Sequence, residues 1–140
     1  MAARDLGTKM KNRPNREGLV IVVDDDHAVR KALQFSLEAE GFVVRAFADG
    51  STLLRESELV NCGCLIVDQN MPGMNGLDLI DRLRDRKILA PAILITTGPS
   101  QVLRERAASA GVCIVEKPLL GNILLDEICN ALTLPSSPSH

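Results

Sequence analysis

Five short apolar runs divide this sequence, and each one ends at polar or charged residues. The runs are Leu19–Val23, Phe42–Phe47, Cys64–Val67, Ala92–Ile95 and Val112–Val115. Most of them are continuously apolar and rich in Val and Ile, without an alternation of apolar and polar side chains. Such runs predict strands that are covered on both faces, because a strand with one face in water tends to place a polar residue at every second position.

A stretch with helical spacing follows each apolar run. The expected helices are one from after residue 26 to near Gly41, one from an Asp49 cap through Leu54, one that opens at Leu77, one from about Gln101 to Ala110, and one from about Asn122 to Leu132. The first has an apolar face made of Val29, Ala32, Leu33 and Leu37. The last is expected to direct four side chains inward, those of Ile123, Leu124, Ile128 and Leu132.

The alternation of strands and helices predicts the fold class. Strand–helix repeats build a parallel α/β sheet with helices on both faces, because each helix carries the chain back to begin the next parallel strand. We expect a flavodoxin-like (βα)5 three-layer sandwich, whose five-stranded parallel sheet has the order 2-1-3-4-5. The expected domain spans residues 18–132, between a flexible basic leader over 1–17 and a flexible Pro/Ser-rich tail over 133–140.

The distribution of charge limits the partners that this chain can bind. The net charge is −2, with +3 on residues 1–17 and therefore −5 on the remainder. The acidic body argues against direct nucleic-acid binding, and three Phe without Tyr or Trp leave no stacking platform for bases. No apolar stretch has the length of a membrane span or the pattern of a signal peptide, so we expect a cytoplasmic protein without membrane association.

The four cysteines are expected to be free thiols. One glycine separates Cys62 from Cys64, and this spacing is not typical of structural zinc sites. Cys113 lies in an expected strand, and Cys129 lies on the apolar side of an expected helix. Buried thiols are usual in a reducing compartment, and a role for Cys62 or Cys64 stays open.

Polar side chains suited to binding ions or phosphate follow four of the five strands. Asp24 and Asp25 follow the first strand, and Asp68 follows the third. Thr96 and Lys117 stand at the corresponding places after the fourth and fifth strands. Because the carboxyl ends of parallel strands meet at one edge of a sheet, and the first and third strands are expected to be neighbours, these side chains should converge.

Three carboxylates in one cleft repel one another unless a cation or a proton joins them. An all-oxygen site that keeps water beside a phosphate suits Mg²⁺. Asp26, in contrast, is expected to cap the first helix, with His27 as a solvated residue of its first turn. With Lys117 as the counter-charge, Asp68 is equipped to accept a phosphoryl group in line, which gives an acyl phosphate that water removes.

These motifs resemble the receiver domain of two-component response regulators over about residues 18–132. The matching elements are the acidic first loop at residues 23–30, the phosphorylation loop at residues 68–76, the switch hydroxyl at Thr96, and the lysine at Lys117 before Pro118, a pair that the family usually joins by a cis peptide bond. Within this CheY-like family, the Val29–Leu33 stretch and the Ile95–Thr96 turn are most similar to FixJ-type receivers.

The resemblance implies a phosphorelay function for these residues. Asp68 would take a phosphoryl group from a phosphohistidine on a sensor histidine kinase or a histidine phosphotransfer protein. Asp25, Asp68 and the backbone carbonyl of Asn70 would hold Mg²⁺, with Asp24 assisting through water. The residues that would bind the phosphoryl group are Thr96 and Lys117. Such a signalling protein catalyses only its own phosphorylation and dephosphorylation, and it switches at the face of its fourth helix, fifth strand and fifth helix, through which a homodimer is also expected.

Four positions near the site bear on how the switch is tuned. Ile114 stands three residues before the lysine, where the family usually has Tyr or Phe, so an aromatic switch coupled to Thr96 is absent. Thr97 stands where a small Ala or Gly is usual, and its hydroxyl is expected to alter the access of water. Asn70 and Gly98 flank the phosphoryl site and are expected to tune the lifetime of the phosphoryl group.

Two other functions share part of this residue pattern. A phosphatase of the haloacid dehalogenase type needs a second Asp two residues after its nucleophile, and Asn70 in that place cannot transfer the proton. A phosphorylation-independent pseudo-receiver that acts as a protein-interaction module is favoured by Ile114 and opposed by the intact phosphorylation site. The stretch after Leu132 is too short for a DNA-binding domain, so a stand-alone receiver and a fragment of a longer regulator both stay open.

Overall fold

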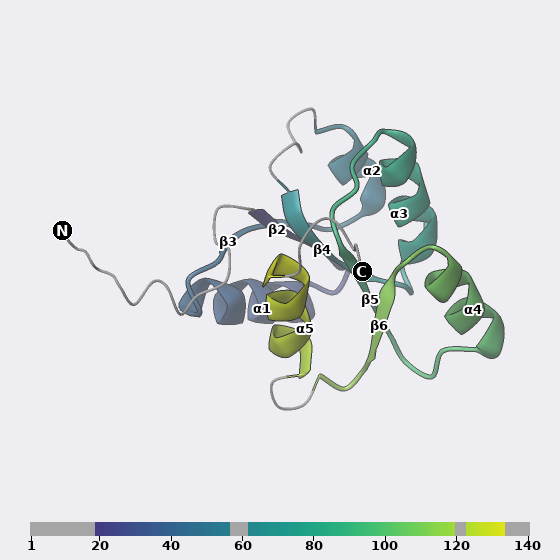
Figure 1. Cartoon of the computed structure of the whole chain (residues 1–140). Helices are drawn as coiled ribbons and strands as arrows, with labels where there is room; N and C mark the ends of the chain where they lie inside the picture. Colours follow the sequence, from purple (N-terminus) through teal and green to yellow (C-terminus); the bar gives the residue numbers. More distant parts are fainter. Residues whose placement is uncertain (1–18, 57–61, 120–122, 134–140) are drawn as a thin grey trace.

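A computed structural model of the chain describes residues 19–56, 62–119 and 123–133 (Figure 1). The expected leader lies outside the described residues, as does the expected tail apart from Thr133, which is the last residue of a helix. The strands are β2 (Leu19–Val23), β3 (Val43–Phe47), β4 (Cys62–Asp68), β5 (Ala92–Thr96) and β6 (Cys113–Glu116). The helices are α1 (His27–Ala39), α2 (Gly50–Leu54), α3 (Gly76–Asp85), α4 (Gln101–Ser109) and α5 (Ile123–Thr133).

The strands pair in parallel in the order β3-β2-β4-β5-β6, which confirms the predicted order 2-1-3-4-5. β2 lies between β3 and β4, and its last residue, Val23, pairs with Phe47 on one side and Val67 on the other. The loop that follows β2 therefore meets the last residue of β4 at the carboxyl edge of the sheet.

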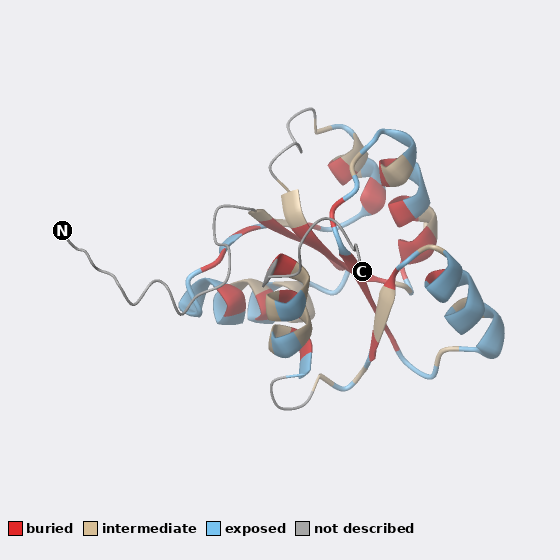
Figure 2. Ribbon diagram, viewed as in Figure 1, coloured by how far each residue is buried: buried red, intermediate tan, exposed pale blue. Residues whose placement is uncertain are grey.

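Alternate side chains of the strands form two apolar cores, one on each face of the sheet. On one face, Val20 and Val22 pack in a cluster with Leu33 of α1 and with Leu124 and Ile128 of α5. The opposite cluster joins β2 and β4 side chains to residues of α2, α3 and α4, namely Leu53, Leu77, Ile80, Leu83 and Ala107. Figure 2 shows the buried strands enclosed between these two helical layers. Each fully buried aliphatic side chain contributes roughly 1.5–3 kcal/mol, so these two clusters hold the three layers together.

The expected helix caps are confirmed. The Asp26 carboxylate accepts a hydrogen bond from Val29 N at 3.2 Å and begins α1, where His27 is the exposed first residue. The Asp49 carboxylate likewise accepts from Thr52 N at 2.7 Å and begins α2. The Asp26 carboxylate therefore serves as a helix cap, which is a different role from the one expected of Asp24 and Asp25.

The expected inward direction of Ile123 is wrong. Its side chain is 55% exposed, whereas Leu124, Ile128 and Leu132 are buried. The three buried residues are spaced by four and form one stripe along α5, and the residue before Leu124 lies about 100° away around the helix. The apolar face of α5 is therefore narrower than its sequence indicates.

Strand boundaries also differ slightly from those expected. β4 begins at Cys62 rather than Cys64, because Leu19 pairs with Cys62 and Val20 with Cys64. This shift of register leaves Gly63 without a partner on β2, which is a β-bulge. β5 extends to Thr96, and β6 lies one residue later than expected.

None of the four cysteines, all of which lie in the described residues, forms a disulfide bond, as expected. Burial raises the pKa of the Cys64 thiol to about 12, and the pKa values of Cys62 and Cys113 to about 11. These thiols stay protonated near neutral pH, and a protonated thiol is a poor nucleophile. Among the helices of the described residues, none has both the length and the apolar character that a membrane span requires.

Candidate functional site

The candidate site is built from the carboxyl ends of four strands. Asp24 directly follows β2, and Asp68 is the last residue of β4. Thr96 is the last residue of β5, and Lys117 directly follows β6. Three of these residues are at most 3% exposed, namely Asp24, Asp68 and Thr96. Among the residues that the structure describes, no other polar or charged residue is buried. Buried polar groups need partners, so their position marks this edge as the place where chemistry is possible.

The structure brings together the three carboxylates that the sequence singles out. One carboxylate oxygen each from Asp24, Asp25 and Asp68 lies within 4.8 Å of the others. Asp25 is exposed, whereas the other two are buried, so the cluster opens to solvent on the Asp25 side.

Asp24 is fixed by three hydrogen bonds. Its backbone N donates to Phe47 O at 3.1 Å, and its Oδ1 accepts from Asp26 N at 2.9 Å. Its carbonyl oxygen accepts from Arg30 Nη1 at 2.8 Å. The second carboxylate oxygen, Oδ2, is buried and has no hydrogen-bond partner. The backbone and one carboxylate oxygen are thus held in place, and the other carboxylate oxygen is left to bind something else.

The surroundings of Asp24 raise the pKa of its carboxyl, so the ionised form is less favourable than it is in an exposed aspartate. Burial raises the pKa of its carboxyl above the ordinary value, and repulsion from Asp68 and Asp25 adds to that rise. The hydrogen bond from Asp26 N and the charge of Lys117 oppose the shift without cancelling it. A cation in the cluster would reverse this balance, because it favours the ionised form.

Asp68 faces one positive charge. Lys117 Nζ lies 3.3 Å from Asp68 Oδ1, and the Lys117 side chain is 29% exposed. The contact is an ion pair without hydrogen-bond geometry, so Oδ1 still lacks a hydrogen-bond donor. Lys117 therefore neutralises part of the charge while it leaves the oxygen available to an incoming group.

The donor set fits a hard divalent cation. All three side chains present oxygen ligands, and two of these residues carry a buried oxygen without a hydrogen-bond partner. Oxygen-only sets favour Mg²⁺ or Ca²⁺ over the transition metals that histidine and cysteine bind. An orphaned buried carboxylate oxygen costs free energy unless a cation or a proton occupies it.

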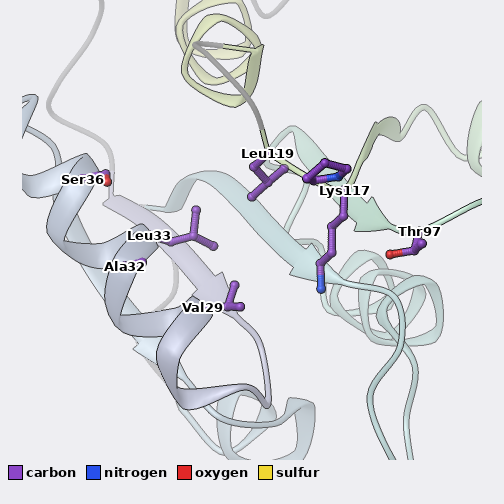
Figure 3. Close-up of a pocket in the computed structure, with 8 residues that line it drawn as sticks. Val29, Ala32, Leu33, Ser36, Thr97, Lys117 and Leu119 are labelled. Atoms are coloured by element: carbon purple, nitrogen blue, oxygen red, sulfur yellow. The ribbon is translucent and has the colours of Figure 1, made fainter.

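A cavity of about 620 Å³ opens beside the lysine. One wall of the cavity is α1, and the opposite wall is the segment after β6. In that segment the Lys117–Pro118 peptide bond is cis. Figure 3 shows Lys117 and Thr97 at one end of this cavity and the α1 side chains of Val29 and Leu33 across from them. Apart from that polar end the lining is mainly apolar.

The remaining residues singled out from the sequence lie around this centre. Asn70 and Thr97 are exposed and line a second cavity of about 340 Å³ together with Thr96 and Gly98. Gly98 adopts a positive φ of 54°, which a residue with a side chain seldom does. Ile114 is half-buried on β6, where it pairs with Leu94 and packs against the core.

Two residues of the site were not identified from the sequence. Arg30 of α1 holds the carbonyl of Asp24, and its Nη2 lies 3.1 Å from Nδ1 of His27. The Gln69 side chain accepts a hydrogen bond from Leu77 N, eight residues further along the chain. Neither residue stands in a sequence pattern of known local capping, so only the folded chain identifies them.

Comparison with known proteins agrees with this architecture. The sequence model of the family described as "Response regulator receiver domain" matches residues 20–128. The C4-dicarboxylate transport transcriptional regulatory protein DctR of Rhodobacter capsulatus is 38% identical over 116 residues, which cover 81% of this chain and 59% of DctR. The transcriptional regulatory protein FixJ of Rhizobium meliloti is 36% identical over 110 residues, which cover 78% of this chain and 54% of FixJ. The chain thus spans only a little over half the length of these relatives.

Solved structures show the same fold. The crystal structure of FixJ-N has 31% sequence identity and a TM-score of 0.73, and the match covers 85% of this chain and 95% of the FixJ-N chain. The structure of the chemotaxis protein CheY4 of Vibrio cholerae has 26% sequence identity and a TM-score of 0.74, and the match covers 82% of this chain and 98% of the CheY4 chain. Since the family model matches most of the chain, and the acidic cluster lies where that fold gathers its strand ends, this chain belongs to the response regulator receiver domain family of two-component systems.

Proposed function

We propose that this receiver domain accepts a phosphoryl group on Asp68 at a Mg²⁺ site and signals by a change of conformation. The observation that carries the proposal is the pair of buried carboxylate oxygens without hydrogen-bond donors, Asp24 Oδ2 and Asp68 Oδ1, in one cluster beside Lys117. Such a cluster is costly in a protein that does not use it.

Asp25, Asp68 and the Asn70 carbonyl are the proposed Mg²⁺ ligands, and Asp24 is proposed to bind through water. The exposed position of Asp25 supports a partly hydrated ion, because such an ion needs one solvated side. When bound, Mg²⁺ would neutralise charge on the transferring oxygens.

Asp68 is the proposed nucleophile. One of its carboxylate oxygens would attack the phosphorus of a phosphohistidine, forming an O–P bond as the P–N bond to the imidazole breaks. Lys117 and the Thr96 hydroxyl would hold two phosphoryl oxygens, and their positions at the ends of β6 and β5 support this. Water would later cleave the acyl phosphate, which restores the carboxylate and releases phosphate.

A sensor histidine kinase or a histidine phosphotransfer protein is the proposed phosphoryl donor. The cavity between α1 and the segment after β6 leads from an apolar wall to Lys117. An apolar partner surface that carries a phosphohistidine would fit there, with the phosphoryl group at the polar end.

The proposed output face comprises α4, β6 and α5. The same face is the proposed interface of a homodimer. α4 is loosely held: Ala107 is its buried residue, and Val102 is 66% exposed. An ion pair of 2.6 Å between Arg104 Nη2 and Glu116 Oε2 ties α4 to β6. A helix with few buried contacts can shift at low cost, which suits a switch.

The alternative is a pseudo-receiver that binds partners without phosphorylation. Ile114 favours it, because an aliphatic residue on β6 cannot report the state of Thr96 as an aromatic ring does in many receivers. The unpaired oxygens of the acidic cluster weigh against it, since a scaffold has no use for them.

Mass spectrometry of the intact protein tests the proposal, since the chain has no Trp or Tyr for a fluorescence assay. We expect acetyl phosphate with Mg²⁺ to add one phosphoryl group, and expect none with EDTA or in Asp68→Asn. Asp26→Asn is the matched control: this acid adjoins the cluster, but it caps α1, and Asn also caps helices. If neither acetyl phosphate nor a phosphohistidine donor adds mass, under conditions in which another receiver reacts, the pseudo-receiver reading holds instead.

A further inference from the structure

Gln69 directly follows the phosphoacceptor and is bonded at three of its polar groups. Its backbone N donates to Ile95 O at 2.8 Å, which ties it to β5. Its carbonyl accepts from Gly76 N at 3.1 Å, and its side-chain Oε1 accepts from Leu77 N at 2.9 Å. The residue thereby joins the end of β4 both to the neighbouring strand and to the start of α3.

The bond from Leu77 N closes the loop that carries Asn70. This loop runs over residues 69–77, and the side chain of Gln69 connects its two ends. The Gln69 carbonyl also accepts from Met71 N at 3.2 Å, a turn whose central residue is Asn70. A turn of this kind fixes both dihedral angles of its central residue. The direction of the Asn70 peptide therefore depends on Gln69 being held in place.

The start of α3 is a firm anchor for this bond. A Cβ atom on Gly76 would lie 2.5 Å from the carbonyl oxygen of Asp68, so the helix begins in direct contact with the end of β4. α3 also has its own N-cap, because Asn75 Oδ1 accepts from Asp78 N at 2.9 Å. The N–H of the buried Leu77 is a separate first-turn donor that Asn75 does not satisfy, and its acceptor comes from the residue that follows Asp68.

We propose that Gln69 is a positioning residue, whose bond to the start of α3 holds the Asn70 carbonyl in the direction that Mg²⁺ binding needs. The inference rests on the proposed function, since it gives the Asn70 carbonyl the role of a ligand. It adds a residue outside the acidic cluster whose side chain sets the affinity of that cluster for the metal.

Two variants separate positioning from simple helix capping. Gln69→Met keeps the length of the side chain and removes its acceptor, whereas Asn75→Ala removes the other cap of the same helix and leaves the loop closed. Isothermal titration calorimetry measures Mg²⁺ affinity, and circular dichroism in EDTA measures the melting temperature. We expect both variants to melt below the wild type. Only Gln69→Met should bind Mg²⁺ more weakly, by about three- to tenfold, the effect of one net hydrogen bond.

Two results would overturn the inference while the proposed function stands. One is a Gln69→Met protein that binds Mg²⁺ as tightly as the wild type does. The other is an equal loss of affinity in Asn75→Ala, which would make Gln69 one more cap. A wild-type protein that binds no Mg²⁺ and accepts no phosphoryl group would instead overturn the proposed function, and this inference with it.

Discussion

Lys117 Nζ and Asp68 Oδ1 lie 3.3 Å apart, although Lys117 follows β6 and Asp68 ends β4, two strands that β5 separates in the sheet. The lysine therefore reaches across the end of β5 to place its charge at the acidic cluster. Three carboxylates and this ammonium group leave the site with a net negative charge, which a divalent cation would neutralise.

Replacing the lysine should affect both stability and chemistry. We expect Lys117→Met to lower the unfolding free energy in EDTA by about 1–2 kcal/mol, less than for a fully buried pair because the side chain is partly exposed. Its phosphorylation by acetyl phosphate should slow on the order of 100-fold, the usual cost of losing a group that stabilises transferred charge. Urea titration followed by circular dichroism and the rate of mass gain measure the two effects. Normal stability and normal phosphorylation together would exclude Lys117 from the site.

Replacing a buried acid should increase the stability of the metal-free protein, whereas replacing the lysine decreases it. Asp24→Asn removes a charge that burial and two neighbouring acids disfavour, while the amide oxygen still accepts from Asp26 N. We expect the metal-free protein to gain on the order of 1 kcal/mol at neutral pH, because one charged, unsatisfied oxygen is relieved. The gain should shrink in saturating Mg²⁺, because the ion binds, and so stabilises, a cluster of three carboxylates more strongly than a cluster of two. A loss of stability in EDTA would contradict this account of the cluster.

The same raised pKa predicts how stability depends on pH. The folded protein binds a proton at Asp24 more readily than the unfolded chain does, since burial raises its pKa. As the pH falls from neutral through that raised pKa toward the ordinary value near 4, protonation of Asp24 should increase the unfolding free energy. The increase is lost when the pH rises again through the raised pKa. Urea titrations of wild type and Asp24→Asn in EDTA should therefore converge at acidic pH and diverge toward neutrality. Parallel curves would show that Asp24 titrates normally.

Much of this arrangement follows from sequence, since apolar runs predict the strands, and four of the five runs place a polar residue at the same edge of the sheet. Asp24 and Asp68 were identifiable for that reason, as were the caps at Asp26 and Asp49. The bond from Leu77 to Gln69 was not, because a contact across eight residues of loop depends on a turn that no local pattern specifies. The sequence also predicts the wrong direction for Ile123, because helical spacing gives two candidate edges of the apolar face, and tertiary packing selects one.

Gly76 is required by close packing rather than by backbone conformation. An added Cβ would lie 2.5 Å from Asp68 O and 2.8 Å from Leu94 Cδ1. We expect Gly76→Ala to cost about 1–3 kcal/mol, as overpacking does, and to slow phosphorylation by displacing the end of β4. Gly111→Ala, outside the phosphorylation loop, is the control, because its positive φ strains a side chain while nothing lies within 4 Å of an added Cβ. It should cost about 1 kcal/mol and leave phosphorylation unchanged. Equal effects in the two variants would refute the steric explanation.

The two neighbouring threonines should have separable effects. Thr96 is buried at the end of β5, whereas Thr97 is exposed at the mouth of the cavity beside Lys117. We expect Thr96→Ala to slow phosphorylation and Thr96→Ser to restore it, because only the hydroxyl is needed. Thr97→Ala should leave that rate unchanged and shorten the phosphoryl lifetime a few-fold, since a smaller side chain admits water. Decay of the added mass after removal of the donor gives the lifetime. A lifetime that Thr97→Ala leaves unchanged would exclude it as a tuning residue.

Locating the phosphoryl group chemically tests the central claim most directly. The protein is phosphorylated with Mg²⁺ and acetyl phosphate, the acyl phosphate is reduced with borohydride to homoserine, and the site is read by peptide mass spectrometry. We expect homoserine at Asp68 alone, and none when EDTA replaces Mg²⁺. Homoserine at Asp24 or Asp25, or the same yield at Asp68 without Mg²⁺, would contradict the assignment of nucleophile and metal ligands.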